Sequence, residues 1–306
     1  MFSIVIPLYD KALQVTATLD AVRRQVFIAY ELIIVDDGST DGSLAVVRDY
    51  LRSHGSFSSH VRLFCQSHAG VSAARNKGIA ESRFDWIAFL DADDSWRPDY
   101  LQEQYELSLA YPFCEVLATG YGFRRGAGQA VPARFSRLPF RGTAGILNNY
   151  FKVAACSHPP LCSLTTIVRK DAIRAVGGFP EGISSGEDLL TWARLAIHCR
   201  IAFNKKNMGT YDQDPGRRNQ DQRARMPAEN DVVGDCLEAL LRQHRCLSGL
   251  REYVGTWHKM RTRIYLTHSM RKEAWAEWRK LVRFTPVHYK TWAYLLILIS
   301  PVNTFQ

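Results

Sequence analysis

Three carboxylates stand close together where an apolar run ends, at Asp91, Asp93 and Asp94. The preceding run, Trp86–Leu90, has the composition of a buried strand, which has no structural need of such an ending. Carboxylates crowded this closely repel one another, and a cation that takes oxygen ligands, such as Mg²⁺ or Mn²⁺, keeps them ionised. The D-x-D spacing of Asp91 and Asp93 therefore predicts a divalent metal site. Such a short motif also has a simpler interpretation, in which Asp94 or Ser95 caps a turn.

Apolar runs alternate with amphipathic patterns through the first hundred residues. The strand-like runs are Phe2–Ile6, Glu31–Val35, Val61–Cys65 and Trp86–Leu90, and the helical patterns lie at 12–25, 44–51 and 71–81. This alternation predicts an α/β fold whose central sheet is mostly parallel, with helices on both faces. Because ligands bind beyond the carboxyl ends of parallel strands, we expect Tyr9, Asp37 and Asp91 to meet at one edge of the sheet.

The second half of the chain predicts a different arrangement. Its expected elements are a helix at Tyr100–Tyr111, a strand at Glu115–Phe123, a loop at Arg124–Gly145, a strand at Ser163–Arg169, a helix at Lys170–Val176, a short strand at Arg200–Phe203 and a loop at Tyr211–Arg225. A Gly-rich turn feeds a further helix whose first turn contains Glu187 and Asp188. We expect one domain at 1–225, with a donor half at about 1–98 and an acceptor half at about 99–225. A basic, helical C-terminal extension follows at 226–306.

Positive charge is concentrated in the C-terminal third. Of the net charge of +9, the segment Ile201–Gln306 holds most, with 18 Lys and Arg against 10 Asp and Glu. No recognition motif or zinc-binding spacing accompanies this charge, so no nucleic-acid partner is expected. A basic region that contains aromatic residues suits an anionic membrane surface better.

The run Trp292–Ile299 is apolar for eight residues, whereas a helix that spans a bilayer needs about 20. We expect it either to pack as a C-terminal helix or to lie in the membrane interface as an anchor. Met1 is followed directly by a strand-like run, so no signal peptide is expected. The seven cysteines are widely spaced and include no C-x-x-C pair, which favours reduced thiols. Together these features predict a cytoplasmic protein, peripheral at the inner face of the membrane.

Six blocks resemble, in their order along the chain, those of the family 2 glycosyltransferases. They are IVIPLYDKA, IIVDDGSTDGS, HAGVSAARNKGI, FLDADDSW, VGGF and GED, and they cover roughly residues 1–200. The resemblance implies an inverting enzyme of the hexosyltransferase type with a GT-A nucleotide-binding fold. It further implies transfer of a sugar from a nucleotide-sugar donor, with UDP favoured, to a hydroxyl of a cell-surface glycan or a lipid-linked glycan precursor. The implied cofactor is Mn²⁺ or Mg²⁺.

The resemblance also assigns the donor-binding residues. Pro7 and Tyr9 lie at the end of the first strand, where family members stack an aromatic ring on the nucleotide base. Asp37 matches an acid that accepts a hydrogen bond from uracil, a role for which an ionised carboxylate is suited because it only accepts. Arg75 matches an arginine that reaches the nucleotide or its phosphates. Without the resemblance, the sequence favours a simpler interpretation, in which Asp37 is a turn residue and Arg75 is a solvent-exposed arginine on a helix.

The metal and the catalytic base are assigned in the same way. Asp93 matches the ligand of the divalent ion, and Asp91, the second candidate, lies toward the ribose and donor sugar; Asp94 supports them. Asp188 matches the base that takes the proton from the acceptor hydroxyl. Glu187 is the alternative base or a support for Asp188. Acids in the first turn of a helix are also favoured by the helix dipole, without any catalytic purpose.

The late loop departs from the family pattern. Many relatives place a histidine or a polar cluster there, near the metal and diphosphate, whereas this chain has arginines. Arg217 and Arg218 are candidates for phosphate contacts. An exposed basic loop that contacts lipid explains them equally well.

Two other functions compete with glycosyl transfer. A sugar nucleotidyltransferase uses a similar sheet, but the segment PLYDKA lacks the Gly-rich phosphate loop that this chemistry usually needs. A non-catalytic nucleotide-sugar-binding or scaffold subunit of a glycan-assembly complex would require neither Asp93 nor Asp188.

Overall fold

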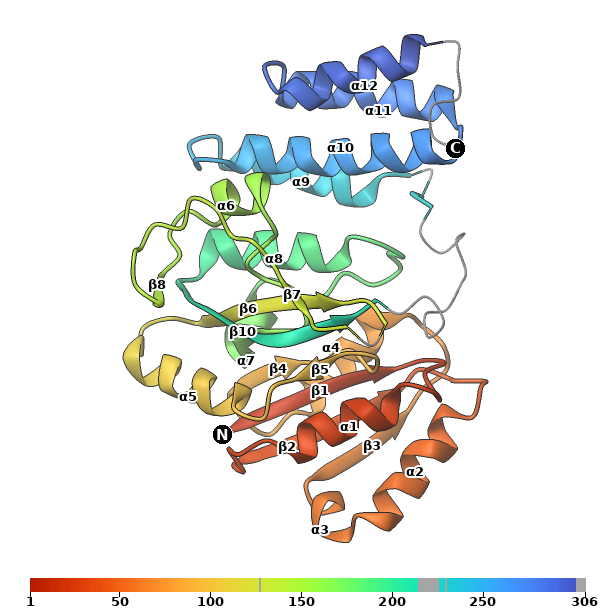
Figure 1. Cartoon of the computed structure of the whole chain (residues 1–306), viewed down its shortest axis with the longest axis vertical. Coiled ribbons are helices and arrows are strands. Elements are labelled where there is room, and N and C mark those ends of the chain that lie inside the picture. The colour runs from red at the N-terminus through yellow and green to blue at the C-terminus, as the bar shows by residue number, and fades with distance from the viewer. Residues whose placement is uncertain (127, 214–225, 229, 301–306) are drawn as a thin grey trace.

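The computed structural model describes residues 1–126, 128–213, 226–228 and 230–300. Its strands are β1 (Phe2–Leu8), β2 (Tyr30–Asp36), β3 (Val61–Cys65), β4 (Trp86–Phe89), β5 (Ser95–Trp96), β6 (Val116–Arg124), β7 (Val131–Pro132), β8 (Ala144–Ile146), β9 (Thr166–Arg169) and β10 (Ile201–Asp212). They form one sheet in the order β3-β2-β1-β4-β9-β6-β10-β5, with β7 beside β6 and β8 beside β10. Figure 1 shows this sheet in the lower and middle parts of the molecule.

Helices cover the sheet and continue beyond it toward the C-terminus (Figure 1). They are α1 (Val15–Arg23), α2 (Ser43–Ser53), α3 (Gly55–Ser58), α4 (Val71–Glu81), α5 (Tyr100–Ala110), α6 (Tyr150–Cys156), α7 (Lys170–Ala175), α8 (Glu187–His198), α9 (Val232–Gln243), α10 (Leu250–Thr267), α11 (Arg271–Phe284) and α12 (Tyr289–Ile299).

Strand β1 explains why the first half of the chain is a sheet covered on both faces. All of its residues are buried, and it pairs in parallel with β2 and β4. Ile4 and Ile6 contact a core that contains Leu19 of α1, whereas Val5 contacts a core that contains Ile79 of α4. Successive side chains of a strand point to opposite faces, so each face needs its own helices. The predicted α/β class, with a mixed, mostly parallel sheet, is confirmed.

The second half of the sheet differs from the expected pattern in three places. Strand β10 extends to Asp212, well beyond the short strand expected at Arg200–Phe203. Its register against β6 shifts between Asn204 and Gly209, and this irregularity interrupts the alternation that reveals a strand in a sequence. Ser95, one of the two residues considered as the cap of a turn, instead lies in β5 with Trp96 and pairs with β10. The loop expected at 124–145 contains β7 and the first residues of β8.

The C-terminal helices lie in layers above α8 (Figure 1). Helices α9 and α10 share one core with α8, which includes Val233, Trp257 and Trp192. A small separate core joins the end of α10 to α11 and α12 through Tyr265 and Leu298, among other residues. The division of the chain at 225 and 226 remains a prediction. Among the described residues, no helix has the length and apolar character that crossing a membrane requires.

Candidate active site

A cleft of about 280 Å³ opens at the carboxyl ends of β1, β2 and β4. It contains five of the residues predicted to bind the donor and the metal: Pro7, Tyr9, Asp37, Asp91 and Asp93. The fold brings them together because each lies at or just beyond the end of a buried strand, and parallel strands end at the same edge of the sheet.

Tyr9 and His68 form the aromatic wall of this cleft. Their ring centroids lie 4.1 Å apart, with an angle of 27° between the ring planes. Tyr9 is 37% exposed, so its ring still offers flat apolar surface of the kind on which a nucleotide base stacks. No role was predicted for His68, although it lies in the loop just after the third strand, where cleft residues are expected.

Asp37 is almost fully buried, and its carboxylate holds the loop after β3. Its Oδ1 accepts hydrogen bonds from Gln66 Nε2 at 2.8 Å and from the Ala69 amide at 2.9 Å. Its Oδ2 accepts from the Gly70 amide at 2.8 Å and lies 2.9 Å from His68 Nδ1. An ionised carboxylate has about four acceptor sites, and the three N–H donors use three of them, with His68 as the fourth donor when its Nδ1 carries a proton. A ligand that donates to Asp37 therefore competes with the Gln66 and His68 side chains.

The two acids of the D-x-D element have different basic partners. Asp93 Oδ2 lies 2.7 Å from Lys11 Nζ, in an ion pair whose side chains are about one quarter exposed. Asp91 Oδ1 lies 2.8 Å from Arg75 Nη2. Asp94 is buried, and its Oδ1 accepts a hydrogen bond from the Asp212 amide at 3.3 Å. Asp94 therefore ties the motif to β10, whereas Asp91 and Asp93 face the cleft.

Arg75 joins the D-x-D element to the helix that carries the predicted base. Its guanidinium is buried and contacts Asp91 at 2.8 Å and Glu187 Oε1 at 3.2 Å. Ser163 Oγ lies 3.3 Å from the same guanidinium nitrogen that binds Asp91. Arg75 therefore binds one acid predicted to lie near the donor and the metal, Asp91, and one predicted to act as or support the base, Glu187. Its role in the structure is to connect them.

Asp188 and Glu187 begin α8 but have different environments. Glu187 is bound to Arg75, whereas the Oδ1 atom of Asp188 accepts a hydrogen bond from the Leu189 amide at 2.7 Å. Burial raises the pKa of Asp188 to about 7, and the negative charge of Glu187 adds to this rise, while Arg75 opposes it. A carboxyl with a pKa near neutrality is suited to accept a proton at physiological pH.

Two predicted phosphate-binding residues cannot be compared with the structure, and the contact between Lys11 and Asp93 was not predicted. Arg217 and Arg218 lie outside the described residues. Lys11 lies in the first block, yet the sequence offered no reason to pair it with Asp93, which is 82 residues away. The basic charge of Lys11 and its position after β1 were the only signals available.

A second group of titratable residues lies in the C-terminal helices. Asp231, His258 and Glu277 are buried, and one potential ligand atom from each lies within 4.8 Å of the others. Arg261 Nε is 3.4 Å from Asp231 and 3.2 Å from Glu277, and Lys280 lies near both acids. These cations already compensate the two carboxylates, so the group is better described as a buried ion network than as a site for Mn²⁺ or Mg²⁺.

Comparison with known proteins identifies a family and a fold. The family described as "Glycosyl transferase family 2" matches residues 3–165. The amylovoran biosynthesis glycosyltransferase AmsB of Erwinia amylovora is 37% identical over 107 residues, which are 35% of this chain and 35% of AmsB. In three further curated relatives, the match likewise spans less than half of their own length.

Two solved structures share the fold at low sequence identity. One is S. aureus TarS 1–349 in complex with UDP-GlcNAc, with a TM-score of 0.66, 16% identity and coverage of 96% of this chain and 83% of that chain. The other is the mannosyltransferase PcManGT of Pyrobaculum calidifontis in complex with GDP-Man and Mn²⁺, with a TM-score of 0.60, 17% identity and coverage of 97% and 85%. By the match over more than half of its residues, this chain belongs to glycosyl transferase family 2, and it has the GT-A fold of these neighbours.

Proposed function

We propose that this chain is an inverting, metal-dependent glycosyltransferase that moves a sugar from a nucleotide-sugar donor, with UDP favoured, to a hydroxyl group. One observation carries the proposal: Arg75 joins Asp91 of the D-x-D element to Glu187, the neighbour of Asp188. This link supports a single site that contains the residues proposed for the donor, the metal and the base.

The cleft supports binding of a nucleotide sugar. The exposed ring of Tyr9 is available to stack on the base, and Pro7 lines the cleft beside it. Asp37 offers the acceptor that uracil N–H requires, in competition with Gln66 and His68. TarS and PcManGT were solved with UDP-GlcNAc and GDP-Man, respectively, which supports a nucleotide-sugar donor.

The acids of the D-x-D element fit a divalent cation. Asp91 and Asp93 are partly exposed to the cleft and offer carboxylate oxygens, the ligands that Mg²⁺ and Mn²⁺ prefer. Asp93 would hold the ion, with Asp91 as the second ligand. When bound, such an ion supplies Lewis-acid chemistry that offsets the negative charge of the leaving diphosphate. The neighbour PcManGT contains Mn²⁺, which supports this choice of metal.

Asp188 is the proposed general base, and Glu187 supports it through Arg75. In the proposed reaction Asp188 takes the proton of the acceptor hydroxyl while the hydroxyl oxygen bonds to the anomeric carbon. The bond from that carbon to the diphosphate oxygen breaks on the opposite face, so the configuration inverts. The nucleoside diphosphate leaves with the bonding electrons, and Asp188 later releases its proton to solvent. Glu187 is less suited to this role because Arg75 already binds it.

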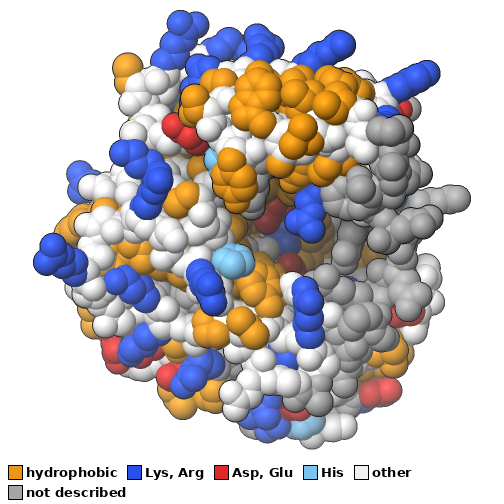
Figure 2. Space-filling view, turned by 45° about the horizontal axis from the view of Figure 1, so that its top comes forward, with side chains coloured by type: hydrophobic (Ala, Val, Ile, Leu, Met, Phe, Trp, Pro, Cys, Tyr) orange, Lys and Arg blue, Asp and Glu red, His pale blue; other side chains and the backbone are white. Residues whose placement is uncertain are grey.

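The acceptor is proposed to be a hydroxyl of a cell-surface glycan or of a lipid-linked glycan precursor. The relative AmsB is named for amylovoran biosynthesis, which supports a polysaccharide pathway. We also propose that the protein works at the inner face of the membrane. Figure 2 shows a group of hydrophobic side chains in the upper part of the molecule, where the C-terminal helices lie, with Lys and Arg side chains along its edge. On α12, Trp292, Leu296 and Ile299 are between 47% and 66% exposed.

The proposal is tested with purified protein, a panel of nucleotide sugars and Mn²⁺ or Mg²⁺. We expect one donor to bind in the presence of metal and to raise the thermal midpoint. Asp188→Asn should abolish transfer to the acceptor and leave donor binding nearly unchanged. Asp171→Asn is the matched control, because Asp171 also lies in the first turn of a helix and binds the next amide.

Different outcomes separate this function from its competitors. Loss of donor binding together with transfer in Asp188→Asn would remove Asp188 from the role of base. Release of pyrophosphate from a nucleoside triphosphate and a sugar phosphate would indicate a sugar nucleotidyltransferase. Donor binding with no turnover in a complete assembly complex would indicate a non-catalytic subunit.

A further inference from the structure

The backbone at the beginning of α8 lies very close to a side chain of the C-terminal helix α10. Gly186, the residue before Glu187, has φ of 85° and lies beside the indole of Trp257. A Cβ atom at Gly186 would lie 2.5 Å from two carbons of this ring and 3.4 Å from a methyl carbon of Val233. Only glycine meets both conditions, the positive φ and the close approach. The indole therefore lies directly against the backbone that leads into Asp188.

A second contact from α10 reaches the same turn. The Tyr253 hydroxyl donates a hydrogen bond to the backbone carbonyl of Leu189 at 3.1 Å, and Tyr253 is buried. Leu189 follows Asp188 directly, and its amide is the donor to Asp188 Oδ1. Trp257 and Tyr253 thus hold the backbone on the two sides of Asp188.

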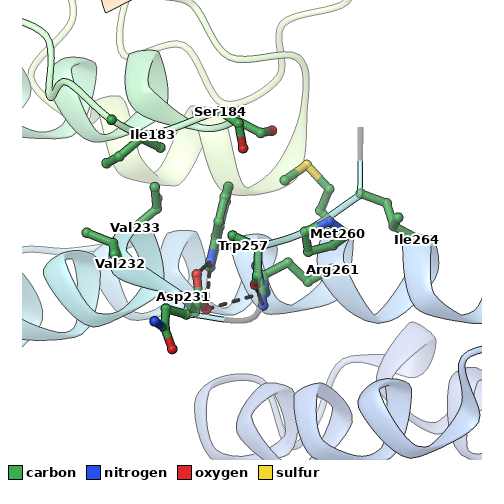
Figure 3. A pocket seen from close by; sticks show the side chains of 14 residues that line it. Ile183, Ser184, Asp231, Val232, Val233, Trp257, Met260, Arg261 and Ile264 are labelled. Carbon is green, nitrogen blue, oxygen red and sulfur yellow. Dashed lines mark hydrogen bonds and ion pairs between the residues drawn. The ribbon is translucent and has the colours of Figure 1, made fainter. Parts of the chain in front are cut away.

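Trp257 is itself fixed by the buried ion network. Its Nε1 donates to Asp231 Oδ1 at 3.0 Å, and the same oxygen accepts from the Gly234 amide at 3.0 Å. Arg261 links Asp231 to Glu277 of α11. Figure 3 shows the Trp257 ring extending from α10 toward the loop of Ile183 and Ser184, with Asp231 at its nitrogen. Through these contacts the ion network fixes the Trp257 ring, and this ring in turn packs against the residue before α8.

The loop just before Gly186 is less tightly packed. A cavity of about 200 Å³ lies between this loop and α10, lined by Ile183, Ser184 and Met260, among other residues. Residues that border a cavity lose packing contacts on that side. The contacts at Gly186 and Leu189 therefore hold the beginning of α8 against α10 beside this cavity, in addition to the core that the two helices share.

We propose that Trp257 and Tyr253 are positioning residues for the catalytic base, so that the C-terminal helices form part of the active site's support. This inference rests on the proposed function, in which Asp188 is the base. Neither residue touches the donor cleft, so the effect on catalysis is expected to be confined to the step that uses Asp188. A misplacement of about 1 Å is enough to lower a rate by roughly 100-fold.

The test compares Trp257→Ala, Trp257→Phe and Tyr253→Phe with Trp278→Phe. Trp278 is a matched control, because its Nε1 also donates a hydrogen bond, to the Thr291 carbonyl, but within the C-terminal helices. Hydrogen–deuterium exchange of peptides that cover residues 183–192 measures how firmly α10 holds the beginning of α8, and it does so without any need for catalytic turnover. We expect faster exchange in the three α10 variants and unchanged exchange in the control. We also expect kcat to fall by roughly 10- to 100-fold, with donor KM changed less than about twofold.

Each outcome separates positioning from general stability. Faster exchange with reduced kcat and unchanged donor KM supports the inference, and Tyr253→Phe keeps the test valid if Trp257→Ala fails to fold. Unchanged exchange in α8, or a loss expressed mainly in donor KM, would overturn it. If the wild-type protein transfers no sugar from any donor, the proposed function fails by itself, while the exchange result still decides whether α10 holds α8.

Discussion

The guanidinium of Arg75 lies 2.8 Å from Asp91, and this buried contact ties the D-x-D element to the rest of the site. The same guanidinium lies 3.2 Å from Glu187. Arg75 therefore compensates two carboxylates that lie 96 positions apart in the chain and on different elements. A planar guanidinium suits this bridge because its donors point in several fixed directions, whereas a lysine presents one point charge.

Replacing Arg75 with Gln should destabilise the protein and damage the site together. Two acids would lose a buried partner, so we expect the free energy of unfolding to fall by about 3 kcal/mol, as measured by urea denaturation. Donor binding should weaken because Asp91 is no longer held. Arg62→Gln is the matched control, since Arg62 also bridges two acids, Glu31 and Glu81, away from the cleft. If both variants bind the donor normally, Arg75 has only a structural role.

The raised pKa of Asp188 predicts a pH dependence of transfer. The base must be deprotonated to accept a proton, so kcat should rise with pH and level off above about 7, the pKa of Asp188. Steady-state rates between pH 5 and 9 measure this profile. A rate that stays constant between pH 5 and 9 would contradict a base whose pKa is raised to about 7.

The same shift predicts how stability depends on pH. A carboxyl whose folded pKa lies above its ordinary value binds its proton more tightly in the folded protein, so the free energy of unfolding falls as pH rises from about 4 to 7. Asp188→Asn removes this effect. At pH 8 the variant should be more stable than the wild type by about 1–3 kcal/mol, less than the full shift because the side chain is partly exposed. At pH 3.5 the two proteins should differ little in denaturant titrations.

The ion pair between Lys11 and Asp93 predicts competition between the ammonium and a metal. Lys11→Met should raise the affinity for Mn²⁺ alone by roughly two- to fivefold, the range expected for a partly exposed ion pair. The affinity for a nucleoside diphosphate should fall, because a positive group near the phosphates is lost. Calorimetry with each ligand separates the two effects. Lys206→Met, which breaks a distant pair with Glu103, should change neither.

The exposed face of α12 predicts binding to anionic vesicles. Leu296→Glu combined with Ile299→Glu should lower binding to phosphatidylglycerol vesicles by at least roughly tenfold, since two apolar side chains are lost from the interface. Binding should also weaken at high salt, because dissolved ions screen the attraction between the basic residues around this face and the anionic lipids. Vesicle co-sedimentation measures both. Val131→Glu, at a 65% exposed position on β7, is the control and should bind as the wild type does.

The sequence by itself determined the parallel half of the sheet and the positions of the acids. The strands β1 to β4 were predicted to within three residues at each end because their apolar runs are local and end at polar residues. The same local signals placed Asp37, Asp91 and Asp93 at strand ends. Because ligands bind beyond the carboxyl ends of parallel strands, these acids were expected to meet in one cleft. Strand β10 was predicted too short because its bulged middle breaks that local pattern.

Only the tertiary structure decided the partners of these residues. Arg75 and Glu187 are separated by 112 positions, and Lys11 and Asp93 by 82, so no periodicity in the sequence links them. The contacts of Asp37 with the 66–70 loop and the contact of Trp257 with Gly186 likewise depend on how distant segments pack. Composition and spacing are properties of neighbouring residues, whereas a partner is chosen by the three-dimensional path of the whole chain.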